Sequence, residues 1–455
     1  MISIFSKAMN GILLKIGISY LLFLTLILLF NNNSSRIESY SIVLFAALVA
    51  LIYLSFASQK YLGTKIGIII IVGFLFKLFI GYIFWELYLF PDYLSNADSE
   101  MKFAHFEYLH TDNLMLEIAK FRINNGFFSF SIEWLITKHI YLHYIMSNLY
   151  LTGNFHPLDI SVQNTLFSTY TAILIASFVK LLGGEKKYIK WALILALYQP
   201  FSMISSIISR NIVGQFFVIL GLYLLFNALR KSNIKLIFLL LLASMSMYLE
   251  RLIYVVFPII ITIIYLFFNK KGEIKILLIA PILLGLISLI SFLFVVDNSF
   301  ESYGKNISGA IFWIYLPINI LRLFIGPFPW TNWFNFDDNS IFLISDYIQA
   351  VVNVTFVYFV IKYFFKNKLT GLIKENYLFF IVSFSLFMFS ALGTEDVHLG
   401  YMAIATVILI PAIVGITNPT QLKSTFVIVL TLFLALNVIL LSTGITGHGI
   451  GTSFR

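Results

Sequence analysis

The sequence contains no cysteine and has few charged residues. Without cysteine the chain cannot form disulfides, a thiolate nucleophile or a cysteine-based metal site. Charged residues make up 11% of the 455 positions, whereas soluble domains carry about 25%. Apolar residues make up 60%, and no stretch is long and polar enough to form a separate soluble domain. Residues 1–455 are therefore expected to form a single integral membrane domain.

Long apolar runs recur along the chain, and a helix needs about 20 mostly apolar residues to cross a bilayer. The pattern predicts an all-α, polytopic protein with about 13 transmembrane helices, within a range of roughly 11 to 14. The first run lacks a small-residue cleavage site after it, so it is expected to be retained. The predicted spans are 11–30, 40–57, 66–90, 162–182, 191–207, 211–228, 236–249, 252–268, 276–296, 348–365, 376–393, 400–416 and 424–442.

The distribution of charge predicts how these spans are oriented. Cytoplasmic loops carry an excess of Lys and Arg. With a cytoplasmic N-terminus, the inner segments hold 19 basic and three acidic residues, and the outer segments hold 10 basic and 17 acidic residues. All seven histidines then fall outside. The net charge of +9 follows this topology, so it is no sign of nucleic-acid binding.

Two outer segments are long enough to carry structure of their own. Residues 91–161 form a polar periplasmic loop in which 101–122 and 127–151 have helical spacing of apolar residues among charges, typical of helices lying in the membrane interface. Residues 297–347 form a second loop, in which the apolar stretch 311–328 is interrupted by prolines and polar residues. We expect that stretch to be re-entrant or interfacial, packed against other helices.

The first outer loop supplies candidate catalytic carboxylates. Asp98 and Glu100 stand two residues apart shortly after the third predicted span. Either could act as a general base at the membrane surface. A structural alternative is a solvated loop in which Asp98 or Ser99 caps the next helix.

Three arginines are candidates for binding a lipid pyrophosphate. Arg210 and Arg251 lie at the outer ends of predicted helical hairpins among apolar neighbours, and Arg322 lies in the predicted re-entrant stretch. Guanidinium groups bind phosphate in a bidentate manner. The alternative is that each arginine extends to bulk headgroups, or that Arg251 pairs with the adjacent Glu250.

Other outer residues have two interpretations each. His398 lies in a short turn and could exchange protons near neutral pH, although an exposed turn histidine is the simpler interpretation. Trp330 and Trp333 could stack on a sugar ring. The alternative is that they belong to the belt of tryptophans found at membrane interfaces. His139 and His143 have the spacing of a helical metal pair but no His-Glu-x-x-His motif, so no metal site is predicted.

Taken together, these features resemble a known family. The outer acidic and arginine residues, the long early external loop, and the runs Tyr-Gln-Pro-Phe at 198–201, Ser-Arg-Asn at 209–211 and Tyr-Leu-Glu-Arg at 248–251 resemble the Wzy-type polymerases of bacterial O-antigen and capsule repeat units. More broadly, they resemble membrane glycosyltransferases of the GT-C type. The resemblance covers most of the chain and is architectural.

The resemblance implies an enzyme of the bacterial inner membrane that joins oligosaccharide repeat units carried on undecaprenyl pyrophosphate. It implies an acidic residue in the first large external loop, which corresponds to Asp98 or Glu100. The sequence has no nucleotide-binding motif, so no cofactor is predicted, and a divalent cation at Asp98 and Glu100 is left open. The partners would be the lipid-linked oligosaccharides and membrane lipids, with a chain-length regulator as a possible further partner.

Other functions remain open from the sequence. A GT-C enzyme that transfers one sugar from a polyprenyl phosphate shares the same features. A flippase for lipid-linked oligosaccharides would place charged groups near the bilayer midplane, and Lys77 and Glu86 lie within the third predicted span. An acyltransferase would favour an Arg-x10-His pattern, which is absent. A non-catalytic assembly subunit is also open.

Overall fold

The structure is a computed structural model. The parts of the chain that it describes are residues 11–30, 36–84, 103–126, 128–131, 140–152, 157–181, 185–198, 210–229, 239, 241–243, 245–246, 351–352, 354–355, 358 and 419–442.

These residues are helical throughout, with short turns and no strand among them, which confirms the all-α prediction for this part of the chain. The helices are α2 (Gly11–Phe30), α3 (Arg36–Leu62), α4 (Gly67–Phe84), α6 (Phe103–Asn125), α7 (Ile140–Met146), the 3₁₀ helix η3 (Ser147–Thr152), α8 (Pro157–Leu181), α9 (Lys186–Tyr198), α11 (Arg210–Leu229) and α21 (Pro419–Ser442).

Several of these helices coincide with predicted spans. Three stretches within the described residues are long and apolar enough to cross a membrane, namely Gly11–Phe30, Tyr40–Leu62 and Asp159–Leu181. Shorter apolar stretches lie in α4, α11 and α21. The chain is thus a membrane protein by the length and composition of its helices. The predicted spans at 252–268, 276–296, 376–393 and 400–416, and the predicted loop 297–347, lie outside the described residues.

The chain divides into two compact units. The first comprises Met1–Lys180, Leu193–Tyr198 and Ser202–Val255, and the second comprises Leu181–Ala192, Gln199–Phe201 and Val256–Arg455. In the second unit Glu185 pairs with Lys187 at 3.0 Å, and its hydrogen bond raises the pKa of Lys187. Lys423, at the start of α21, lies over the Trp191 ring at 5.5 Å.

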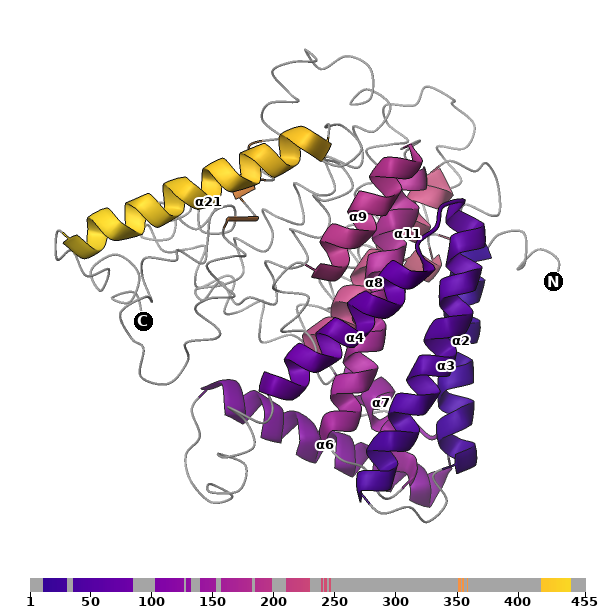
Figure 1. The fold of residues 1–455 in the computed structure, drawn as a ribbon. Helices are drawn as coiled ribbons and strands as arrows, with labels where there is room; N and C mark the ends of the chain where they lie inside the picture. Colours follow the sequence, from indigo (N-terminus) through magenta and orange to yellow (C-terminus); the bar gives the residue numbers. More distant parts are fainter. Residues whose placement is uncertain are drawn as a thin grey trace, which may run out of the picture. The chain divides into compact units, whose positions relative to one another are not determined.

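The first unit is built on a helical bundle of α2, α3, α4, α8 and α11 (Figure 1). α2 packs along α3, and α3 along α4. Ring contacts of Phe167 with Phe216 and of Phe178 with Tyr223 follow the same order along α8 and α11, so these two helices are parallel. Lys180, at the end of α8, bonds Tyr61 at the end of α3. The ends of α8 and α3 therefore lie together. Since α3 starts where α2 ends, α8 and α11 begin at that same end of the bundle.

A tight turn joins α3 to α4. Gly63 has φ of 70°, and its N–H donates to the Gln59 carbonyl at 3.0 Å. A left-handed residue at this position commonly ends a helix, and glycine adopts it without steric cost. The Gln59 side chain accepts the Gly67 N–H at 3.3 Å, which satisfies a free donor at the start of α4. The turn therefore fixes α4 antiparallel to α3.

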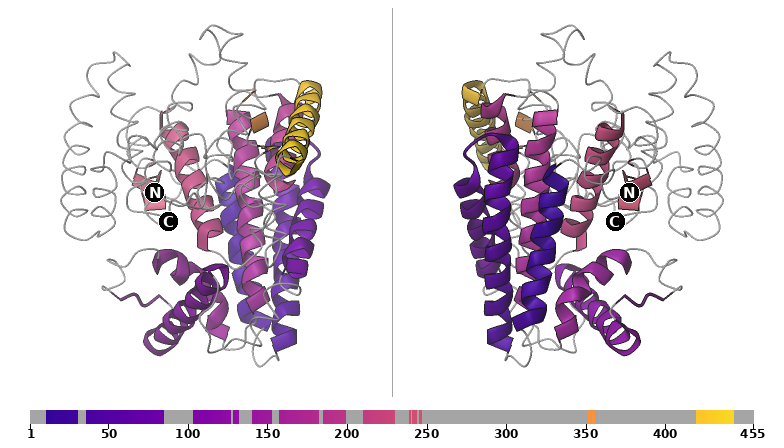
Figure 2. Two further views of the ribbon diagram at one scale, coloured as in Figure 1. Left: turned by 90° about the vertical axis from the view of Figure 1, so that its left-hand side faces the viewer. Right: turned by 90° about the vertical axis from the view of Figure 1, so that its right-hand side faces the viewer.

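The helices between α4 and α8 form a layer across the opposite end of the bundle. This transverse layer (α6, α7 and η3) lies inclined to the bundle axis where α2 ends (Figures 1 and 2). α6 packs on α7 and η3, α7 contacts α11, and η3 contacts α2. Residues 103–125 are helical as predicted, but 128–131 are not. Gly126, with φ of 109°, ends α6 there.

Close packing of α4 on α9 provides a test of this arrangement. A Cβ on Gly73 would lie 3.0 Å from Leu197 Cδ1 and 3.2 Å from Leu197 Cβ, whereas a Cβ on Gly17 would meet nothing within 4 Å. We expect Gly73→Ala to destabilise the protein by about 1–3 kcal/mol through overpacking. Gly17→Ala should leave stability unchanged or raise it by about 0.5–1 kcal/mol. Thermal unfolding in detergent measures both, and equal stability of the two variants would contradict the packing.

Candidate functional site

Helix α8 is the polar centre of the bundle. Every residue from 159 to 179 is buried, although α8 is among the stretches apolar enough to cross a membrane. Buried polar groups are costly unless they are hydrogen-bonded. The buried polar side chains of α8 are Asp159, Ser161, Gln163, Asn164, Thr165, Ser168, Thr169, Tyr170, Thr171 and Ser177.

Hydroxyl groups on α8 are satisfied partly within the helix. Thr165, Thr169, Thr171 and Ser177 each donate to the carbonyl four residues earlier, at 2.8–3.0 Å. Such bonds let a helix carry hydroxyl side chains in apolar surroundings. These four residues are therefore accounted for by the structure of the helix itself.

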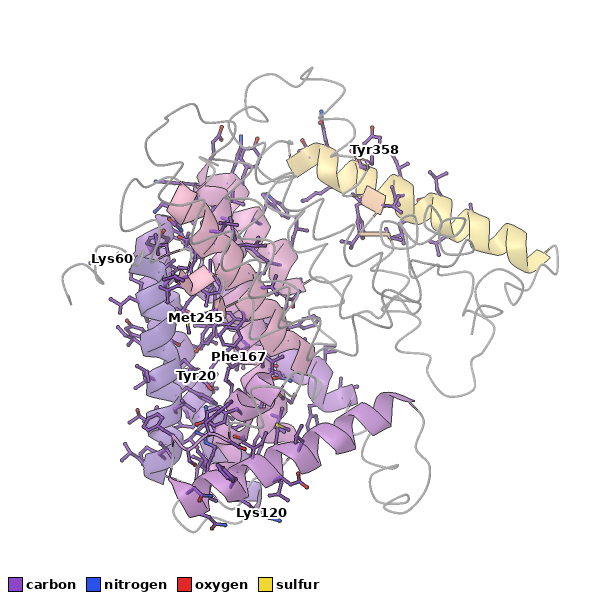
Figure 3. All side chains as sticks on the ribbon, turned by 180° about the vertical axis from the view of Figure 1, so that it is seen from behind. Tyr20, Lys60, Lys120, Phe167, Met245 and Tyr358 are labelled. Carbon is purple, nitrogen blue, oxygen red and sulfur yellow. The ribbon has the colours of Figure 1, made fainter. Side chains whose placement is uncertain are left out.

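Tyr170 ties α8 to two neighbouring helices. Its hydroxyl lies 3.1 Å from Ser19 Oγ, and Ser19 donates to the Ala50 carbonyl at 2.9 Å. The chain of bonds thus joins α8 to α2 and through it to α3. The Phe167 ring, one turn away, lies 5.2 Å from the Tyr20 ring and 5.3 Å from the Phe216 ring. Figure 3 shows Tyr20 and Phe167 together in the interior of the bundle.

Lys77 brings an amino group to this helix. It lies midway along α4, is 0% exposed, and its Nζ donates to Ser168 Oγ at 2.7 Å. No carboxylate is paired with Lys77 within the described part of the chain. Ionisable groups inside membrane helices are costly, and they usually mark substrate or ion pathways. Lys77 and Ser168 are accordingly the strongest candidate for chemistry within the bundle.

Gln163 adds unused polar capacity to α8. It is 0% exposed, and neither its Nε2 nor its Oε1 has a hydrogen-bond partner among the described residues. The Nε2 of Gln215 on α11, at 5% exposure, is in the same condition. Buried amides nearly always have partners. These two side chains are therefore candidates for contact with a ligand.

Arg122 fastens the transverse layer together. It is 1% exposed, and its Nη1 donates to the Tyr144 carbonyl at 3.1 Å and to Ser147 Oγ at 2.8 Å. The guanidinium also lies 4.1 Å from the Tyr144 ring centroid. Burial lowers the pKa of Arg122, but a guanidinium stays protonated at neutral pH. The buried charge thus holds α6 against α7 and η3.

The layer is in turn bonded to the bundle. Asn148 in η3 donates from Nδ2 to the Tyr20 hydroxyl at 3.3 Å. Because the Tyr20 ring contacts the Phe167 ring of α8, η3 is connected to the polar centre. The transverse layer is therefore part of the packed first unit.

One predicted site residue falls on a described helix. Arg210 is the first residue of α11, at the layer end of the bundle, and its side chain lies outside the described residues. The side chains of His139 and His143 also lie outside them, and the described residues contain no group of acidic or histidine side chains that could hold a metal ion. The other predicted residues lie entirely outside, namely Asp98, Glu100, Arg251, Arg322, Trp330, Trp333 and His398.

Neither α8 nor Arg122 is among the site residues predicted from the sequence. The signal was present for α8, because its run of Ser, Thr, Asn and Gln is unusual for a span facing lipid. For Arg122 the sequence offered only one more outer charge. Its burial depends on Tyr144 and Ser147, 22 and 25 residues later.

Comparisons with known proteins give no relative for this chain: no family model, no curated protein and no solved structure matches it.

The Lys77–Ser168 bond can be tested by coupled substitutions. Ser168→Ala leaves a buried amino group without its acceptor, which should cost about 1–3 kcal/mol. In a Lys77→Met background the same substitution should cost clearly less, because no amino group is then left without its acceptor. Ser177→Ala is the matched control, since Ser177 is 0% exposed and bonds its own helix. Unfolding in detergent measures the cycle, and equal costs in both backgrounds would exclude the pairing.

The role of Arg122 can be tested on the transverse layer. Arg122→Gln should cost at least about 1.5–3 kcal/mol because it removes charged hydrogen bonds, and it should raise amide hydrogen exchange across α6. Lys120→Gln removes an exposed charge two residues away and should change neither quantity. Unaltered exchange in α6 of the Arg122 variant would show that the guanidinium does not hold the layer.

Proposed function

We propose that the chain is a membrane glycosyltransferase that polymerises undecaprenyl-pyrophosphate-linked oligosaccharide repeat units at the periplasmic face of the bacterial inner membrane. The proposal rests on the one-sided distribution of acidic residues and arginines and on the family resemblance of the sequence. A transferase for a single polyprenyl-phosphate-linked sugar shares this support. A reaction at one membrane surface needs a fixed structure there, and the transverse layer is such a structure.

The position of Arg210 is the observation that carries the proposal. It begins α11 at the layer end of the bundle, and α11 contacts α7 of the transverse layer. The free N–H groups and the dipole of a helix N-terminus favour an anion. An arginine at the same place adds a full positive charge suited to phosphate. Arg251 and Arg322 are proposed to complete a clamp on the pyrophosphate.

The proposed reaction is a displacement at an anomeric carbon. The acceptor sugar hydroxyl attacks C1 of the donor sugar, a new C–O glycosidic bond forms, and the C1–O bond to pyrophosphate breaks. The lipid pyrophosphate leaves with the bonding electrons, and Asp98 or Glu100 accepts the hydroxyl proton. His398 is the alternative proton acceptor. The arginines stabilise the departing charge, while Trp330 and Trp333 hold sugar rings in position.

The pyrophosphate clamp is tested by replacing two of its proposed arginines and, as a control, an arginine at the opposite end of α11. Arg210→Ala and Arg251→Ala should each slow chain extension by about 100- to 1,000-fold, as loss of a transition-state charge contact does. Long glycans should disappear from gels of a complemented deletion strain, and single repeat units should persist. Arg230→Ala is the control, since Arg230 directly follows the opposite end of α11. Normal glycan ladders from both variants, at normal protein levels, would refute the clamp.

Transport of a lipid-linked oligosaccharide is a second candidate, and the buried Lys77 favours it. A transporter carries ionisable groups within the membrane bundle. Lys77 lies midway along α4, is fully buried and contacts Ser168 in the buried part of α8. An enzyme of the membrane surface has no evident need for a buried lysine there.

Lys77→Met separates the two candidates. If the protein polymerises, the variant should still make long glycans, because the substituted residue lies away from the layer end. If it transports, the variant should lose all surface glycan and accumulate lipid-linked units on the cytoplasmic leaflet. An impermeant sugar-oxidising reagent is added to sealed spheroplasts. Units on the cytoplasmic leaflet are protected from it, and units on the outer leaflet are oxidised.

A further inference from the structure

Lysines from two helices gather on one tyrosine at the end of the bundle opposite the transverse layer. Lys15 of α2 donates to the Ala57 carbonyl at 3.0 Å, and its Nζ lies 5.6 Å from the Tyr61 ring centroid. Lys180 of α8 lies 4.3 Å from the same centroid and donates to the Tyr61 carbonyl. Lys60 directly precedes Tyr61 in the chain and Lys65 follows it by four residues, and both lysines are exposed. We call these four residues the lysine end.

The dipoles of the helix ends compensate only a small part of the positive charge of these lysines. Lys15 and Lys180 bond carbonyls in the last turns of α3, where cations are favourable. Since α3, α8 and α11 end here while α2 and α4 begin, their dipoles together contribute about −0.5 elementary charge. Four lysines bring four positive charges. Most of the positive charge at the lysine end is therefore not compensated by the helix ends.

Carboxylates do not neutralise it within the described first unit. The acidic side chains described there are Glu117, in the transverse layer, and Asp159, near the start of α8. Asp159 and Lys180 are 21 residues apart on one helix, which is about 30 Å. Figure 3 shows Lys60 and Lys120, the latter in α6, at opposite ends of the first unit. The lysine end therefore carries positive charge that no described carboxylate of the first unit neutralises.

Tyrosines at this end suit a position at the level of lipid headgroups. The Tyr61 hydroxyl lies 3.1 Å from the Tyr223 hydroxyl of α11, and Tyr61 is half-buried. Tyrosine is enriched where a membrane protein meets the interface. The leaflet on the cytoplasmic side, where the lysine end is predicted to lie, is rich in anionic lipid, and it attracts basic residues near a membrane surface.

We propose that the lysine end binds the phosphate of an anionic phospholipid, with Lys60 and Lys65 as the free contacts beside Tyr61. Lys15 and Lys180 hold the end of α3 in place and add to the local potential. Such a lipid would join α2, α3 and α8 at one interface and stabilise the bundle. This inference does not depend on the reaction that the protein catalyses.

The experiment uses the full-length protein purified in a neutral detergent. Phosphatidylglycerol is added, and bound lipid and unfolding temperature are measured by native mass spectrometry and thermal denaturation. Phosphatidylglycerol should bind and raise the unfolding temperature, and phosphatidylcholine should not. The double variant Lys60→Gln with Lys65→Gln should bind phosphatidylglycerol about 30-fold more weakly, given the usual contribution of each lysine at an anionic surface.

Three results would overturn the proposal. The first is equal binding of phosphatidylcholine, which would show apolar adsorption only. The second is equal stabilisation by inorganic phosphate alone, which would identify a site for free phosphate. The third is an equal loss in Lys120→Gln, the control that removes one charge at the other end. The variants keep the carbonyl bonds of Lys15 and Lys180, so they are expected to fold normally. Circular dichroism checks this.

Discussion

Helix α8 carries polar side chains along most of its length and is buried from residue 159 to residue 179, so its surroundings have to satisfy those groups. Four hydroxyls bond the helix's own carbonyls. Two more groups are satisfied by neighbouring helices: Tyr170 by Ser19 of α2, and Ser168 by Lys77 of α4. In an apolar medium an unsatisfied group is expensive, and this constraint fixes the register of the helices around α8.

The transverse layer extends the same logic to one end of the bundle. Arg122 is buried but supplied with the Tyr144 carbonyl, the Ser147 hydroxyl and an aromatic face. Asn148 then links the layer to Tyr20, which packs on α8. The two ends of the bundle differ in their charged residues. One carries the layer with Glu117 and Asp159, and the other carries lysines around Tyr61.

These two ends and the buried centre offer different chemistry. A surface reaction on lipid pyrophosphate would use the layer end, where α11 begins at Arg210. A transport step would use Lys77 and the Gln163 amide, which has no hydrogen-bond partner among the described residues. Lipid binding at the lysine end is compatible with both. The burial of Lys77 gives transport a stronger basis than the sequence had given it, while the carboxylates and most arginines of the proposed enzyme site lie outside the described residues.

The helices of this protein were predictable because apolar runs near 20 residues have few alternatives in a membrane: the run 11–30 coincides with α2, and 211–228 lies within α11. α8 begins at Pro157, five residues before its predicted span, since hydropathy penalises Asp159 and Ser161 without knowing that they are buried. Sequence spacing also could not pair Lys77 with Ser168, which are 91 residues apart. Local composition determines which segments become helices. Which polar groups meet is decided only when the helices pack, because a hydrogen bond depends on distance in space.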